Sequence, residues 1–124
     1  EETPNYDDAL LYYATGLIYN KQVPAADALL MKRYGTTAVD QQQILQAYFA
    51  TKMYDRLDKI YAQRVAKDPT DIQSAVAEAV LQYFVTGSKS VGITALNKLI
   101  AANPSVKTQI QSFIDQINAG TLKP

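Results

Sequence analysis

Residues 48–69 read YFATKMYDRLDKIYAQRVAKDP, and residues 83–104 read YFVTGSKSVGITALNKLIAANP. Each stretch begins with a Tyr-Phe pair and ends in proline, and the two prolines, Pro69 and Pro104, stand 35 residues apart. Large apolar residues recur at matched positions between these ends. A fixed period of about 20–50 residues is typical of arrays of stacked structural units. The two stretches therefore predict a repeat protein.

Hydrophobic periodicity predicts helices along nearly the whole chain. Alternation of apolar and polar residues is absent, and no Asn-Gly or Asp-Gly turn marks a strand hairpin. The predicted fold class is all-α, as a single domain over residues 1–124, with antiparallel helical hairpins at about 6–35, 38–68 and 70–103 and a capping helix at about 105–119. Within the hairpins, the first four helices are expected at about residues 6–19, 24–34, 39–52 and 54–67.

Helix ends are marked by residue types that satisfy free backbone groups. Gly35, Gly87 and Gly120 predict stops, and Asn103 before Pro104 predicts an N-cap followed by proline at the first helical position. Candidate N-caps for the other helices are Thr3 or Asn5, Thr70 or Asp71, and Ser88 or Ser90.

The spacing resembles the tetratricopeptide repeat, a family of helix-turn-helix units of about 34 residues. In that family the first helix carries a large residue and, four positions later, an aromatic one. The second helix carries a small residue, an aromatic residue and a proline. The central repeat of this chain supplies Ile44, Tyr48, Tyr61 and Pro69, with Leu57 where the family prefers a small residue. The next repeat supplies Tyr83 and Gly87, then Gly92 in the small slot, Leu96 in the aromatic slot, and Pro104. A first, more degenerate repeat aligns 31 residues before the central one, with Tyr13, Leu17, Lys21, Ala26, Leu30 and Tyr34.

The resemblance covers about residues 7–104 and implies a right-handed stack of three hairpins, a tetratricopeptide-like α-solenoid. The absence of tryptophan leaves a plain α-helical repeat as the alternative description. A second position supports the same alternative. The family has a small residue there, whereas the three repeats of this chain have Arg33, Arg64 and Leu99.

Particular packing contacts follow from these assignments. Gly92 stands where the two helices of the third hairpin must approach closely. The first helix presents one apolar face with Leu10, Tyr13, Ala14 and Leu17. The last helix has an apolar stripe with Val106, Ile110, Phe113, Ile114 and Ile117, and its polar side suits the outer cap that a terminal repeat needs.

The residues that most enzymes use for proton transfer and metal binding are missing. The chain has no histidine and no cysteine, which excludes the common nucleophile pairs and zinc sites, and it has no glycine-rich phosphate loop. Asp7 with Asp8, and Asp68 with Asp71, suggest either acid–base or calcium chemistry, or helix capping. Their places at helix starts favour capping. We expect no catalytic residue, no metal, no cofactor and no enzymatic activity.

Charge gives no support for nucleic acid or membrane partners. Twelve basic and twelve acidic residues leave a net charge of zero. The nearly apolar stretch at residues 76–85 is far shorter than a bilayer span. One face of the fourth helix could meet phosphate or an acidic protein segment, but a solvated outer face is the favoured interpretation; it carries Arg56, Lys59, Gln63 and Lys67.

Three uncharged triplets recur on matched stripes of the first helices of the hairpins. In tetratricopeptide stacks this face lines the concave groove where partner peptides dock, so the resemblance implies a site for an apolar or amide-rich segment, with Phe49 and Phe84 as anchors. The alternative is that these side chains fill the core. The triplets are Leu11, Thr15 and Ile18; Gln42, Gln46 and Phe49; and Ala77, Leu81 and Phe84.

Two functions of different class follow. One is a stand-alone scaffold that binds a protein or peptide. The other is a tethered accessory domain that stabilises or recruits for a larger bacterial enzyme, because residues 96–120 are similar to the terminal repeats of bacterial membrane proteins of the O-antigen-ligase type. The chain opens without methionine, which suggests a fragment of a longer, membrane-associated protein. Compartment and oligomeric state are left open by the sequence.

Overall fold

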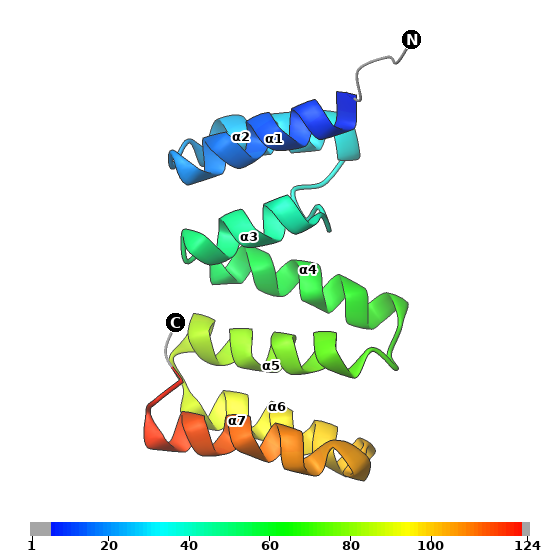
Figure 1. Ribbon diagram of the computed structural model, residues 1–124, viewed down its shortest axis with the longest axis vertical. Helices are drawn as coiled ribbons and strands as arrows, with labels where there is room; N and C mark the ends of the chain where they lie inside the picture. Colours follow the sequence, from blue (N-terminus) through cyan, green and yellow to red (C-terminus); the bar gives the residue numbers. More distant parts are fainter. Residues whose placement is uncertain (1–5, 123–124) are drawn as a thin grey trace. The chain divides into compact units, whose positions relative to one another are not determined.

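The computed structural model describes residues 6–122, with side chains from residue 9 onward. Over this range the chain forms seven α-helices and one short 3₁₀ helix, and no strand (Figure 1). The predicted all-α class is confirmed. None of the described helices is both long and apolar enough to cross a membrane. The helices are α1 (Tyr6–Tyr19), α2 (Val23–Tyr34), α3 (Gln42–Ala50), α4 (Tyr54–Lys67), α5 (Ile72–Thr86), α6 (Lys89–Ala102), η1 (Pro104–Val106) and α7 (Lys107–Ala119).

The chain divides into two compact units, an N-terminal unit that ends at Leu57 and a C-terminal unit that begins at Asp58. In the N-terminal unit α1 packs against α2 and against α3. In the C-terminal unit α6 packs against α5 and against α7. Each unit therefore has one helix that packs against two others.

Two turns that follow the first helices of hairpins have the same backbone conformation. Lys21 and Lys52, which are 31 residues apart, both adopt left-handed φ angles, of 61° and 62°. The residue after each lysine donates a backbone hydrogen bond of 2.8 Å to the carbonyl five residues earlier. Gly87, a further 35 residues on, also has a left-handed φ angle, of 69°. Matched positions in the three sequence repeats thus share a local backbone state.

The start of α3 differs from its predicted position. The helix begins at Gln42 and not at Val39, although Val39 is apolar and buried. The Thr36 hydroxyl accepts a hydrogen bond of 3.0 Å from the Ala38 N–H, and this local bond favours a turn over a helix. The helix also ends at Ala50, two residues early, because Lys52 takes the left-handed conformation.

The predicted caps are correct at most helix ends. The Asp71 carboxylate accepts a 3.1 Å hydrogen bond from the Ser74 N–H and caps α5, and the Ser88 hydroxyl caps α6. Asn103 stands at the predicted N-cap position with Pro104 directly after it, but the helix that begins there is the 3₁₀ helix η1 ahead of α7, and the Asn103 side chain makes no cap bond. Thr3 and Asn5 lie outside the described residues.

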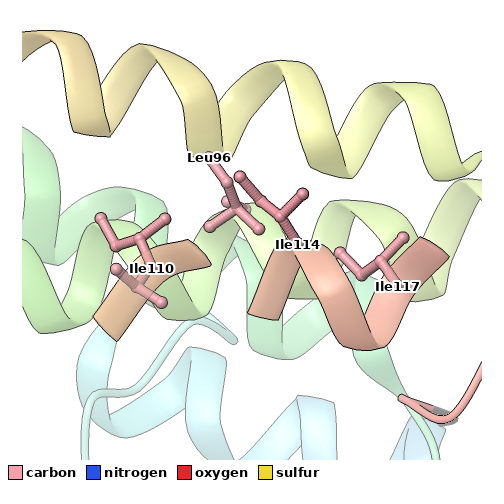
Figure 2. Packing of buried hydrophobic residues seen from close by; sticks show 6 residues of the cluster. Leu96, Ile110, Ile114 and Ile117 are labelled. Atoms are coloured by element: carbon pink, nitrogen blue, oxygen red, sulfur yellow. The ribbon is translucent and has the colours of Figure 1, made fainter. Parts of the chain in front are cut away.

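The core of the C-terminal unit is a cluster of aliphatic side chains from α5, α6 and α7, and Figure 2 shows Leu96 beside Ile114 within it. Gly92 lies next to this cluster, where an added Cβ would stand 2.8 Å from the Cβ of Tyr83. The close approach predicted at Gly92 is therefore present. The buried members of the cluster are Val76, Ala79, Leu96, Ile110, Ile114 and Ile117.

Candidate protein-binding surface

The most accessible of the three predicted triplets lies on α3, in the N-terminal unit. Gln42, Gln46 and Phe49 are all exposed, and we call them the α3 stripe. Spacings of four and three residues place them on one helix face. The ring of Phe49 is 57% exposed, although its edge rests against the ring of buried Tyr54, with 6.0 Å between centroids. An aromatic side chain is thus held in place and still open to solvent.

The α1 triplet is mostly inaccessible. Leu11 and Ile18 are buried in the core of the N-terminal unit, and Thr15 is half-buried. The Thr15 hydroxyl donates a 2.6 Å hydrogen bond to the carbonyl of Leu11, so it offers a partner only an acceptor. Because α1 packs against α3, the structure brings Thr15 and the α3 stripe into the same unit.

The α5 triplet belongs to the C-terminal unit and resembles a core more than a groove. Leu81 is buried, and Ala77 and Phe84 are half-buried. The Phe84 ring packs against the ring of Tyr83, with 5.7 Å between centroids and 46° between planes. Of the two predicted anchors, Phe49 is therefore the more exposed.

An ion pair joins two helices that contribute to the N-terminal unit, α2 and α4. Arg56 donates through both terminal nitrogens to the Asp27 carboxylate, and Nη2 lies 2.8 Å from Oδ2. The guanidinium also lies over the ring of buried Tyr48, 5.9 Å from its centroid. Hydrogen bonding to Asp27 raises the pKa of Arg56, and burial raises the pKa of Tyr48. This network fixes the start of α4 against α2.

The predicted basic face of α4 loses one member to this network. Arg56 is engaged with Asp27 and is only partly accessible, whereas Lys59, Gln63 and Lys67 are exposed. Three residues on one helix face, one of them uncharged, form a modest basic surface. The interpretation of this face as a solvated surface agrees with their exposure.

Asp58 occupies the same place in the second repeat that Asp27 occupies in the first, 31 residues earlier. The matching position for Arg56, 35 residues later, holds Val91 and so lacks a cation. Within the described residues, Asp58 Oδ1 is buried and has no hydrogen-bond partner. Burial, with a smaller effect of Glu78, raises the pKa of Asp58 to about 6. Alignment of the repeats could have shown that Asp58 lacks an arginine partner, because Val91 stands where the preceding repeat has Arg56.

Asp68 and Asp71, the acidic pair whose side chains are described, both have structural roles. Asp71 caps α5, and the hydrogen bonds from Ser74 lower its pKa. Asp68 accepts hydrogen bonds from the Thr70 N–H, at 3.1 Å, and from the Thr70 hydroxyl, at 2.5 Å. The side chains of Asp7 and Asp8 lie outside the described ones.

A second accessible apolar surface was not predicted from the sequence. Tyr13 was expected on the packed face of the first helix, but it is 62% exposed on α1, and Tyr12 and Tyr19 are 82% and 48% exposed. The three tyrosines border a shallow open depression with Gly16 and neighbouring residues. Periodicity groups Tyr13 with other apolar residues on one face of the first helix, but it does not tell whether another element covers that face.

Comparison of the chain with protein-family models, with curated proteins and with solved structures finds no match. The functional proposal therefore rests on the chain's own surfaces.

Proposed function

We propose that this chain is a protein-interaction scaffold that binds an apolar or amide-rich peptide or helix through the α3 stripe. The observation that carries the proposal is the exposed ring of Phe49 beside two exposed glutamines, without a charged residue among the three. Scattered single apolar residues on a surface are ordinary. An aromatic ring fixed by an edge contact and flanked by amides is a more specific arrangement.

The chemistry of the stripe indicates what it would recognise. A well-placed aromatic side chain at the centre of an interface supplies much of its binding energy. The contact with Tyr54 already restricts the Phe49 ring, so less conformational freedom is lost on binding. Each glutamine amide offers an acceptor and two donors, which suits the backbone of an extended segment or an amide side chain. With no cation in the stripe, a terminal carboxylate is a poor ligand.

The proposal includes the arrangement of the repeats as a tetratricopeptide-like, right-handed stack of hairpins with α7 as the cap. The matched left-handed residues Lys21, Lys52 and Gly87 support equivalent hairpins. In such a stack Thr15, Ala77 and Phe84 would lie on the same concave side as the α3 stripe. We assign the scaffold no chemistry of its own, since the chain has neither histidine nor cysteine.

Selection from a random peptide library on the immobilised chain tests the proposal. We expect enriched peptides to contain apolar and amide side chains and to bind in solution. Phe49→Ala should weaken their binding by about 2 kcal/mol, or about 30-fold. Met31→Ala removes an equally exposed apolar side chain from α2 of the same unit and should leave affinity unchanged.

Two results would contradict the proposal. In one, the selection enriches no peptide that binds in solution. In the other, the enriched peptides bind Phe49→Ala as tightly as the parent, which would place the binding surface elsewhere. Circular dichroism of each variant confirms that lost binding does not reflect lost folding.

A further inference from the structure

The outer face of α1 is the most exposed aromatic surface in the described part of the chain. Tyr12, Tyr13 and Tyr19 are 82%, 62% and 48% exposed, and Gly16 lies between them along the helix. We call these four residues the α1 tyrosine face. None of them is charged, and none belongs to the α3 stripe.

The matching face of α3 is covered in part. The residues 31 positions after Tyr13 and Gly16 are Ile44 and Ala47, and both are fully buried, whereas those after Tyr12 and Tyr19 are Gln43 and Ala50, and both are exposed. The side of the first helix that holds Tyr13 and Gly16 is therefore a packing surface in the second repeat and an open surface in the first. Its aromatic composition suits contact with another protein surface.

Gly16 provides independent evidence for a close contact. Glycine in the middle of a helix is destabilising relative to alanine. At Gly92 the packing of Tyr83 explains the absence of a side chain, since an added Cβ would stand 2.8 Å from the Tyr83 Cβ. At Gly16 an added Cβ would meet nothing within 4 Å. Packing among the described residues gives no reason for this glycine, whereas a second backbone approaching α1 does.

We propose that a second copy of this chain docks on the α1 tyrosine face, with the two α1 helices antiparallel and crossing at Gly16. Tyr12 and Tyr19 lie four residues before and three residues after Gly16, on one side of the helix. A twofold axis at the crossing brings Tyr12 of one copy beside Tyr19 of the other. The rings can then pair edge to face while their hydroxyls stay at the rim.

The available area fits a weak dimer. Aromatic side chains bury about 200 Å² each, and the exposed fractions of the three tyrosines leave about 400 Å² to cover in each copy. This is about half of the roughly 800 Å² that each partner contributes to a stable interface. Leu17 and Asn20, which line the same depression, add to it. We therefore expect a dimer that dissociates on dilution.

Cysteine crosslinking tests the geometry, because the chain has no cysteine of its own. Two Gly16→Cys copies should form a disulfide-linked dimer under mild oxidation, since the crossing places the two backbones close together. Ser112→Cys, on an exposed position of α7, is the control and should stay largely monomeric. An equimolar mixture of Tyr12→Cys and Tyr19→Cys should give the mixed disulfide well above the two-to-one excess over each symmetric disulfide that random pairing produces. Equal crosslinking of Gly16→Cys and the control, or mixed and symmetric disulfides in the random proportion, would overturn the proposal.

Sedimentation equilibrium over a wide concentration range provides the second test. The parent should show a monomer–dimer equilibrium, and Gly16→Gln should raise its dissociation constant at least tenfold by blocking the close approach. The same substitution should leave the thermal midpoint of the dilute monomer unchanged or higher, because the space at Gly16 is open. A parent that stays monomeric at all concentrations would refute the dimer. A dimer unaffected by Gly16→Gln would refute this interface.

Discussion

Arg56 holds both carboxylate oxygens of Asp27, with 2.8 Å between Nη2 and Oδ2, and so ties the start of α4 to α2. Both side chains are about three-quarters buried. Removing one partner leaves the other partly desolvated without compensation. Asp27→Ala should therefore destabilise the protein by about 1–3 kcal/mol in chemical denaturation. The double variant with Arg56→Met should lose less than the sum of the two single losses. If the stability losses of the two single variants add up to the loss of the double variant, the interaction between Asp27 and Arg56 contributes no stability.

Asp58, whose buried Oδ1 has no hydrogen-bond partner among the described residues, should make stability depend on pH. Its pKa is about 6 in the folded protein and 3.8 in the ordinary state. Between these values the folded state binds more protons than the unfolded state, so the free energy of unfolding rises as pH falls through 6. Glu78 is the charged neighbour that adds to the effect.

The matched comparison is Asp58→Asn. This variant should be more stable than the parent at neutral pH, and the difference should shrink as the pH approaches about 5. Thermal melts at a series of pH values measure both. A difference between the two proteins that is the same at every pH would exclude a raised pKa at Asp58.

The two glycines within helices should respond to substitution in opposite directions. Gly92→Leu forces a side chain into the space that Tyr83 and Ile117 already fill, which should cost about 1–3 kcal/mol of stability. Gly16→Ala meets open space and should stabilise the dilute monomer by about 0.5–1 kcal/mol through helix propensity. Denaturant titrations of the two variants check this pair. Equal effects would mean that the hairpin contact at Gly92 is misassigned.

Removal of α7 should expose the core of the C-terminal unit. A chain ended at Asn103 lacks Ile110, Ile114 and Ile117, which pack with fully buried Leu96 (Figure 2). We expect this product to self-associate or precipitate, because an open end of a helical array exposes apolar surface. Light scattering of the purified product is the measurement. A monomeric product with the parent's stability would show that α7 is dispensable.

Much of the helical content could be predicted from the sequence because helix ends carry local signals. Predicted and observed bounds agree for α1 and α4, and the stop glycines Gly35, Gly87 and Gly120 all take left-handed conformations. The start of α3 was misplaced because Val39 fits the helical period, yet it is buried within the irregular connection between α2 and α3. The sequence pattern alone does not distinguish an apolar residue buried on a helix from one buried in the connection between two helices.

The candidate surfaces depend on tertiary context, and there the sequence was less informative. Periodicity places Leu11, Ile18 and Leu81 on the same faces as the exposed members of their triplets, but all three are buried. Tyr13 shows the opposite case, because it stands on a face that the second repeat packs and the first leaves open. Which face another element covers is a property of the folded chain and not of the helix.

Phe49→Ala, studied for stability and binding together, separates a binding anchor from a core residue. The free energy of unfolding should fall by no more than about 1 kcal/mol, the size of the edge contact with Tyr54. The affinity for a library-selected peptide should fall about 30-fold, as measured by isothermal titration calorimetry. The opposite pattern, a loss of about 3–5 kcal/mol in stability with unchanged peptide affinity, would make Phe49 a core residue and refute the binding role of the α3 stripe.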